Sequence, residues 1–197
     1  MRPALLVIDL QNAFFEDPAL AVQRSRIVGA CNELIGAARD AGAPALIVRT
    51  EHERDRSTWT LSMLDDGQGF AFRGTEQAEL LPELDAEGLP QLVKRRDSAF
   101  IGTDLLARLR VWGADSVLLA GVSAHLCLAQ TAADAYAHNV RAFFAAEAMG
   151  AESPERAEAM LAVVLEEYRQ ERLAQHEALG FIRAGALPAM RDAHDEA

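Results

Sequence analysis

The chain has 197 residues, of which 50% are hydrophobic and 25% charged, as is typical of one globular domain and not of a disordered chain. Its 19 basic and 30 acidic residues give a net charge of −11, which disfavours nucleic acid and anionic membranes as partners. No apolar run approaches the roughly 20 residues of a membrane span. We expect a single domain over residues 1–197.

The N-terminus and the cysteines bear on the cellular compartment. The first three residues lead directly into an apolar strand pattern, which leaves no room for a signal peptide. The two cysteines, Cys31 and Cys127, are too few for a disulfide framework, and free thiols are typical of a reducing compartment. We therefore expect a cytoplasmic protein.

Apolar runs of strand length alternate with helical patterns along the chain. The pattern predicts strands at residues 5–9, 44–50, 91–95, 117–122 and 140–146, and helices at residues 25–41 and 103–112 and around Cys127. Serine is favoured at the N-cap of a helix and proline at the first helical position, so Ser153 and Pro154 predict the start of a further helix. Residues 180–183 are interpreted as a last edge strand. The alternation predicts an α/β fold in which helices cover both faces of a mostly parallel sheet of about six strands.

Residues 51–88 form a polar interval that is longer than a connection between a strand and a helix normally is. The interval carries Trp59, Met63, Phe70 and Phe72 among Asp, Gly and Gln residues. It is either a lid that lines a substrate pocket or a surface that packs against another subunit. The two interpretations are compatible, because pockets often form where subunits meet, and we expect a homodimer or a higher homo-oligomer.

The segment GVSAHLCLAQTAADA, residues 121–135, places Cys127 near the start of an alanine-rich helix that follows a buried strand. A thiol there lies near unpaired amides and the positive end of the helix dipole, which favour the thiolate. The alternative is a small core residue, because free cysteine is among the most buried residue types. Cys31 has helical spacing with Ile27 and Leu34, which favours core packing for that thiol.

Three residues that can carry chemistry are expected at one edge of the sheet. Asp9, Lys94 and Cys127 each end or follow a predicted strand, and parallel sheets bind ligands at the carboxyl ends of their strands. Asp9 follows four apolar residues, so its carboxylate needs a partner, and Lys94 can supply the opposite charge. Lys94 is also the only lysine among the 19 basic residues, and the pKa of an ammonium can be tuned by burial whereas that of a guanidinium cannot. Each residue alone could be a cap, a surface charge or a core residue, so the joint arrangement is what indicates a site.

Residues 4–14, 94–100 and 121–135 resemble the isochorismatase-like cysteine hydrolases. This superfamily includes nicotinamidases, carbamoylsarcosine and ureidoacrylate amidohydrolases, biuret hydrolase and isochorismatases. The resemblance covers roughly residues 3–168 in order and spacing. It implies a Rossmann-like, three-layer αβα domain.

The resemblance also implies a catalytic triad of Asp9, Lys94 and Cys127. It further implies a cis peptide bond between Val122 and Ser123, which turns the backbone amides of Ser123 and Cys127 into an oxyanion hole. In the chemistry of these groups, Asp9 takes the thiol proton, Lys94 stabilises the charged pair, and the thiolate attacks a carbonyl carbon. We expect a hydrolase of a small amide, ureide, carbamoyl compound or lactam that forms a thioester intermediate.

Metal chemistry and a cysteine–histidine dyad are both disfavoured. Nicotinamidases carry one Asp and two His after the second strand as metal ligands, where this chain has Thr50, His52 and Arg56. We therefore expect no metal and no other cofactor, and nicotinamide is in doubt as a substrate. His125 lies two positions from Cys127, and residues two apart on a helix do not face each other, so His125 is interpreted as a pocket wall or surface residue.

Other functions stay open at this point. An isochorismatase proper cleaves a vinyl ether without a thiol nucleophile, so Cys127 counts against that branch, and a non-catalytic scaffold would make the three edge residues accidental. The hypothesis of a redox thiol enzyme is disfavoured, because no second cysteine lies near Cys127 in the sequence. The aromatic candidates for a pocket that binds a small, flat substrate are Phe14, Trp59 and Phe100.

Overall fold

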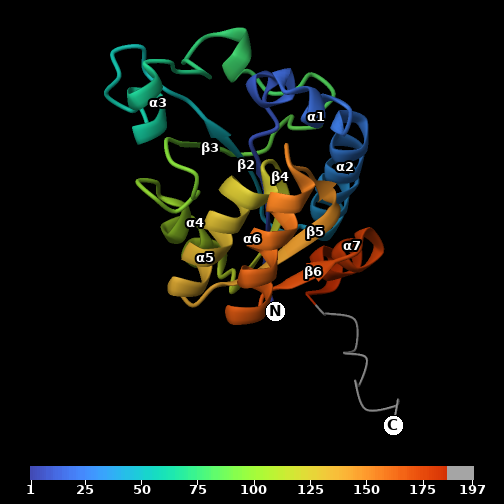
Figure 1. The fold of residues 1–197 in the computed structure, drawn as a ribbon. Coiled ribbons are helices and arrows are strands. Elements are labelled where there is room, and N and C mark those ends of the chain that lie inside the picture. The colour runs from blue at the N-terminus through green and yellow to red at the C-terminus, as the bar shows by residue number, and fades with distance from the viewer. Residues whose placement is uncertain (186–197) are drawn as a thin grey trace.

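The computed structural model describes residues 1–185, and its centre is one sheet of six parallel strands (Figure 1). The strands lie in the order β3-β2-β1-β4-β5-β6. Their bounds are β1 (Pro3–Ile8), β2 (Ala45–Thr50), β3 (Gln91–Lys94), β4 (Ser116–Gly121), β5 (Arg141–Met149) and β6 (Glu171–Leu173). The predicted α/β fold is confirmed, and every described strand pair is parallel.

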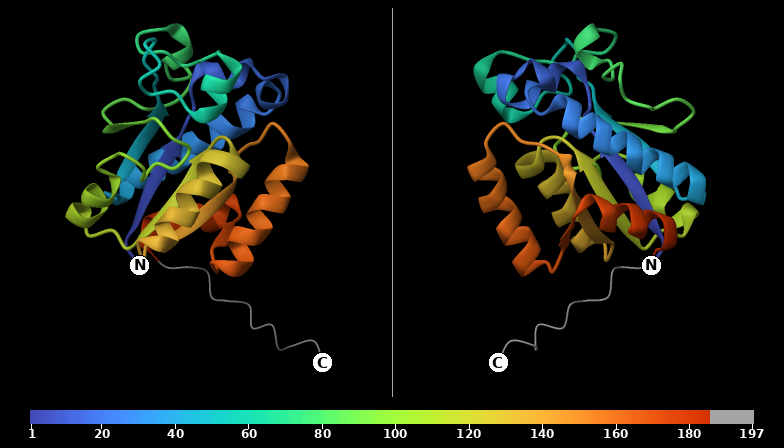
Figure 2. Two further views of the ribbon diagram at one scale, coloured as in Figure 1. Left: turned by 60° about the vertical axis from the view of Figure 1, so that its left-hand side comes forward. Right: turned by 90° about the vertical axis from the view of Figure 1, so that its right-hand side faces the viewer.

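Helices cover both faces of the sheet, as Figure 2 shows from two sides. One apolar core contains buried residues of α2 and α7, and a second contains those of α4, α5 and α6. None of the described helices is long and apolar enough to cross a membrane. Their bounds are α1 (Pro18–Ala21), α2 (Arg24–Ala41), α3 (Leu61–Asp66), α4 (Leu105–Trp112), α5 (Ala129–Ala137), α6 (Pro154–Glu167) and α7 (Gln175–Ala184).

The central strands β1 and β4 are buried along their whole length. Alternate residues of β1 enter the two cores, so that Leu5 and Val7 lie in one and Leu6 and Ile8 in the other. A strand covered on both faces is an unbroken apolar run, which is the pattern that predicted it. Because β1 pairs with both β2 and β4, the carboxyl ends of these strands meet at one edge.

The end of the described chain differs from the prediction. Residues 180–183 lie in α7 and not in an edge strand, which is instead β6. Ala178, Phe181 and Ile182 are buried together, and this spacing is that of an apolar helix face. β6 carried no apolar signal, because two of its three residues are only half-buried. The last part of the predicted domain, residues 186–197, lies outside the described residues.

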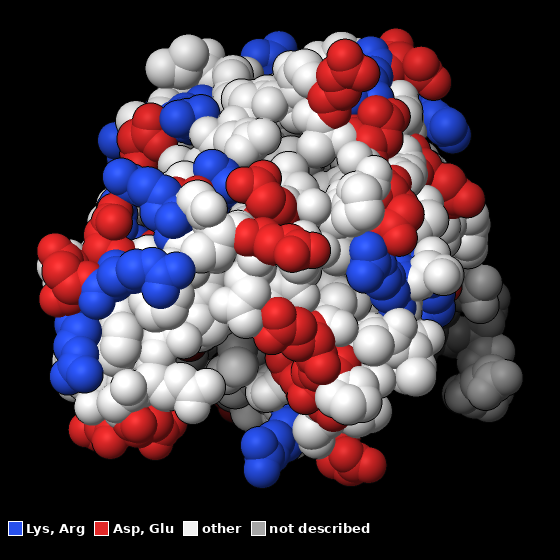
Figure 3. Space-filling model, turned by 90° about the horizontal axis from the view of Figure 1, so that it is seen from above, with Lys and Arg blue, Asp and Glu red and all other residues white. Residues whose placement is uncertain are grey.

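Residues 51–88 lie beyond the carboxyl ends of the strands, at the top of Figure 1. They contain α3 and a short 3-10 turn (Glu76–Ala78). Isolated bridges pair Gln11 with Leu80 and His52 with Phe72, so the interval is tied to the end of the sheet. Figure 3 views this end from above and shows acidic and basic side chains interspersed over it.

Candidate active site

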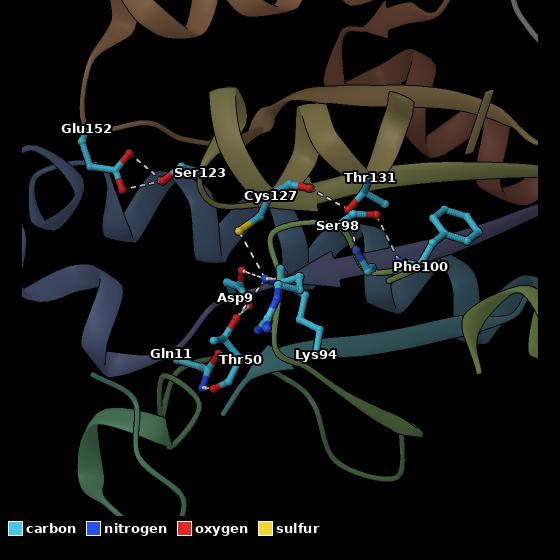
Figure 4. Close-up of polar contacts among 12 residues, drawn as sticks. Asp9, Gln11, Thr50, Lys94, Ser98, Phe100, Ser123, Cys127, Thr131 and Glu152 are labelled. Atoms are coloured by element: carbon cyan, nitrogen blue, oxygen red, sulfur yellow. Dashed lines mark hydrogen bonds and ion pairs between the residues drawn. The ribbon is translucent and has the colours of Figure 1, made fainter. Parts of the chain in front are cut away.

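Asp9, Lys94 and Cys127 meet at the carboxyl ends of β1, β3 and β4 (Figure 4). Lys94 Nζ lies 2.8 Å from Asp9 Oδ2 and 3.2 Å from Cys127 Sγ. The Asp9 and Lys94 side chains are 0% and 1% exposed, and Cys127 is 5% exposed. A buried carboxylate and a buried ammonium each need a partner of opposite charge, and here Asp9 and Lys94 are that partner for each other.

Thr50, the last residue of β2, completes the polar cluster. Its hydroxyl accepts a hydrogen bond from Lys94 Nζ at 2.9 Å and donates one to Asp9 Oδ1 at 2.9 Å. Gln11 fixes the backbone of Thr50, because its side chain binds the Thr50 amide at 2.7 Å and the Thr50 carbonyl at 2.8 Å. Sequence reasoning missed this role for both residues and treated Thr50 only as a missing metal ligand.

Two residues at this edge, Gly121 and Asp9, have unusual backbone conformations. Gly121 has a φ of +114°, and a Cβ atom on it would lie 1.9 Å from the carbonyl oxygen of Ile8, so only glycine fits there. Asp9 has a φ of +58°, in a region that L-residues rarely adopt. Strain of this kind concentrates at functional sites, where the surrounding structure holds it.

Cys127 lies in a π-helical turn (Ala124–Leu128) that leads into α5, so it is not in a regular first α-helical turn as predicted. Single π-helical turns occur frequently at functional sites. The peptide bond between Val122 and Ser123 is cis. Within residues 1–185, the Ser123 amide donates to no protein group. The Thr131 hydroxyl donates to the Cys127 carbonyl at 2.6 Å, and it accepts from the Ala99 amide at 3.0 Å.

The charges of the site set the resting protonation state of the sulfur. Burial raises the pKa of the Cys127 thiol well above its ordinary value, and the Asp9 carboxylate raises it further, while Lys94 lowers it. Burial lowers the pKa of Lys94, but the charges of Asp9 and Cys127 and the hydrogen bonds to these two residues together outweigh this effect, and the pKa is raised overall. At neutral pH the site holds an ammonium and a thiol. The raised pKa keeps the proton on the sulfur at neutral pH, and the contribution of the helix end to the thiolate stays a prediction.

A cavity of about 290 Å³ opens beside these residues. Cys127 and Lys94 form part of its wall, and so do the apolar residues Phe14, Met63 and Phe70. The rings of Phe14 and Phe70 meet edge to face with their centroids 5.6 Å apart. Two of these residues come from the interval 51–88, so that interval lines the cavity; whether it also contacts another subunit stays a prediction.

Two of the three predicted pocket aromatics lie elsewhere. Trp59 is 8% exposed, packs against Phe72 and donates its indole N–H to the Glu53 carbonyl at 2.9 Å. Phe100 is also 8% exposed, and its ring packs against His138. Neither residue lines the cavity, whereas Phe14 does.

A second polar pair also lines the cavity. The Ser123 hydroxyl lies 2.5 Å from both carboxylate oxygens of Glu152 and shares its one hydrogen between them. His125 is not among the lining residues, and its Nδ1 lies 3.9 Å from Glu152 Oε2. The sequence pattern gave no signal for Glu152, which follows β5 in an irregular connection.

The residues at the nicotinamidase metal positions do not form a metal site. Within residues 1–185, no three His, Cys, Asp or Glu side chains are grouped so that they could hold a metal ion. Thr50 is occupied by Asp9 and Lys94, and the Arg56 guanidinium lies over the Trp59 ring. The donor set therefore does not fit a metal, and independence from metal stays a prediction for the reaction.

A family model described as the Isochorismatase domain matches residues 3–169. The match includes strands β1 to β5 and the polar residues at their ends. A probable inactive nicotinamidase of Arabidopsis thaliana is 34% identical over 142 residues, which cover 68% of this chain and 72% of that protein.

The names of two further relatives denote different activities. A probable isochorismatase of Pseudomonas chlororaphis is 31% identical over 150 residues, covering 75% of this chain and 71% of that protein. The crystal structure of N-carbamoylsarcosine amidase from Thermoplasma acidophilum is similar with a TM-score of 0.77 and 27% identity, covering 90% of this chain and 98% of that chain. One of these names denotes an amide substrate and the other isochorismate.

Proposed function

This chain belongs to the isochorismatase family of hydrolases, and on that premise we propose that it hydrolyses a small non-peptide C–N bond with Cys127 as nucleophile. The substrate class is an amide, a carbamoyl compound, a ureide or a lactam. The observation that carries the proposal is the position of Lys94 Nζ, which contacts both the Asp9 carboxylate and the Cys127 sulfur at the wall of a cavity. This is the arrangement of a base, a charge partner and a nucleophile.

The first half of the reaction forms a thioester. Asp9 takes the proton of the Cys127 thiol, and the sulfur attacks the carbonyl carbon of the substrate while the carbonyl electron pair moves to oxygen. The backbone amides of Ser123 and Cys127 are proposed to stabilise that oxygen. The tetrahedral intermediate then collapses, the C–N bond breaks, and the leaving nitrogen takes the proton that Asp9 holds.

The second half hydrolyses the thioester. Asp9, again a carboxylate, takes a proton from water, and the hydroxide equivalent attacks the thioester carbon. The C–S bond breaks, the acid product leaves, and Cys127 recovers its proton. Throughout the cycle Lys94 stays protonated, because its raised pKa keeps it cationic, and it stabilises each negative charge that forms beside it.

The cavity supports a small substrate. Its volume of about 290 Å³ is at the lower end of the range for ligand pockets. Its lining combines the apolar residues Phe14, Met63 and Phe70 with the polar groups around Cys127. A flat molecule with an apolar part and one carbonyl group suits this lining.

Two other functions are less well supported than C–N bond hydrolysis. A vinyl-ether hydrolase of the isochorismatase type is favoured by the name of the Pseudomonas chlororaphis relative, but that chemistry leaves the Cys127 sulfur without a role. A non-catalytic scaffold is suggested by the name of the inactive Arabidopsis relative. The contacts among Asp9, Lys94 and Cys127 count against it, because an inactive scaffold has no need of a charged cluster beside a cavity.

A substrate screen tests the proposal. Product formation is measured by mass spectrometry for a panel of small primary amides, N-carbamoyl acids and lactams, with the vinyl ether isochorismate included, so that released amines, ring-opened lactams and ether cleavage are all detected. We expect hydrolysis of at least one C–N substrate, and none with Asp9→Asn, whose amide cannot take a proton, although thermal unfolding should show that the variant is folded. Activity should persist after exhaustive chelation. Ether cleavage that persists in Cys127→Ala would contradict the proposal.

A further inference from the structure

His52 lines the cavity but has no part in the proposed thioester chemistry. The residue is 2% exposed, and its ring packs against Phe70 with the centroids 5.7 Å apart. Its backbone is held by hydrogen bonds to Ala71 and Arg73, each 3.0 Å long. The ring is therefore held in one position, in the same cavity wall as Phe70.

The hydrogen bonds of His52 determine which ring nitrogen carries a proton. Nδ1 lies 3.0 Å from the carbonyl oxygen of Thr58, and a carbonyl oxygen can only accept, so Nδ1 carries the hydrogen. In a neutral imidazole the other nitrogen, Nε2, then has a lone pair and can only accept. Within residues 1–185, Nε2 has no hydrogen-bond partner.

The ring stays neutral at neutral pH. Burial lowers the pKa of His52, and the positive charges of Arg96, Lys94 and Arg95 lower it further, against an opposing effect of the Thr58 hydrogen bond. The three nearby cations lower the pKa because they repel the positive charge that a protonated imidazole ring would carry. Within residues 1–185, Nε2 is not one of the fully buried side-chain atoms that lack a hydrogen-bond partner, so the cavity that His52 lines contains an accessible neutral acceptor in a fixed position.

We infer that His52 Nε2 accepts a hydrogen bond from an N–H group of the substrate, and that His52 selects substrates that carry such a group. The inference rests on the proposed function and narrows its substrate class. Primary amides, ureides, N-carbamoyl compounds and unsubstituted lactams carry the required hydrogen. Fully N-substituted amides, esters and vinyl ethers lack it and would leave the Nε2 lone pair unpaired.

A pair of reactive probes tests this without knowledge of the natural substrate. 2-Chloroacetamide and chloroacetone are nearly the same size and both alkylate thiols, but the first has an NH₂ group where the second has a methyl group. The rate of Cys127 alkylation is followed by mass spectrometry for each probe and divided by the rate with glutathione. We expect the normalised rate in the wild-type protein to be about fivefold higher for chloroacetamide, the effect of one net hydrogen bond.

Two variants separate the acceptor from the packing of the ring. Asn in His52→Asn can still donate to the Thr58 carbonyl but is too short to place an acceptor at the Nε2 position, so the rate ratio should fall to near one. Gln in His52→Gln reaches that position with an amide oxygen and should keep most of the preference. Thermal unfolding checks that both variants are folded.

The outcomes distinguish this inference from the proposed function. A wild-type ratio near one, or the wild-type ratio retained in His52→Asn, would overturn the role of His52 while Cys127 remained the alkylated nucleophile. Failure of both probes to alkylate Cys127 under conditions that alkylate glutathione would overturn the proposed nucleophile, and this inference with it.

Discussion

The two cysteines of this chain are both buried, and they differ in what surrounds them. Cys31 lies in α2 within an apolar core, where its sulfur contacts the Ala148 carbonyl at 3.4 Å. Cys127 lies between Lys94, Thr131 and a cavity. Burial raises the pKa of both thiols, that of Cys31 to about 12.

The comparison shows that a low resting pKa is not what distinguishes the two sites. Neither thiol is a thiolate at neutral pH, so an argument from pKa alone would call both inert. Cys127 differs because Lys94 Nζ contacts both its sulfur and the Asp9 carboxylate, and because it lines a cavity. In the proposed function, these partners and this access are what make Cys127 reactive.

Replacing each thiol by alanine should give the largest contrast. Cys127→Ala removes the nucleophile and should lower the rate of C–N hydrolysis by at least about a thousandfold. Cys31→Ala should keep the rate within about twofold and cost about 1 kcal/mol of unfolding free energy for the atoms removed from the core. Steady-state kinetics and denaturant unfolding of both variants provide the comparison. Equal loss of activity in the two variants would remove the distinction between the sites.

The ammonium group of Lys94 should not be replaceable by another cationic group of different shape. Lys94→Arg keeps the charge, but a planar guanidinium cannot fit a site in which one nitrogen contacts both Asp9 and Cys127, so kcat should fall by about a hundredfold or more. Arg108→Lys is the matched control, because Arg108 pairs with Asp104 on the surface of α4 and should leave activity unchanged. Wild-type activity in Lys94→Arg would mean that the single lysine has no special role.

The smallest expected effect concerns Cys31 and the unfolding free energy of the protein at alkaline pH. The pKa of Cys31 is raised from 9.0 to about 12 in the folded chain, so the unfolded state loses this proton first as the pH rises. The stabilisation is fully present below pH 9 and is lost between about pH 9 and 12. From pH 8 to 10, the unfolding free energy of the wild-type protein should fall by about 1 kcal/mol more than that of Cys31→Ala. Parallel pH profiles for the two proteins would show that Cys31 is not the group involved.

Much of the fold could be predicted from the local pattern of apolar residues in the sequence. The buried strands were predicted within a few residues because a strand covered on both faces is an unbroken apolar run, as in β1 and β4. β6 was missed because it has one fully buried residue. Phe181 and Ile182 suggested a strand, although in α7 they share a helix face with Ala178.

The meeting of Asp9, Lys94 and Cys127 was predictable because parallel strands end at the same edge. The role of Thr50 was not, because it depends on register: Thr50 is paired with Lys94 across β2 and β3. Trp59 was misplaced because residues 51–88 have no periodicity from which to read direction. Long connections of this kind take their course from tertiary contacts that one sequence does not display.

The most direct test of the account is to trap the enzyme during turnover of a C–N substrate found in the screen. The protein is quenched in acid, digested and mapped by mass spectrometry for acyl groups on both cysteines. We expect the acyl mass on Cys127, none on Cys31, and faster loss of the adduct in the wild-type protein than in Asp9→Asn pre-acylated with a thioester donor. Turnover with no acyl group on Cys127 under conditions that preserve thioesters, or an acyl group on Cys31, would contradict it.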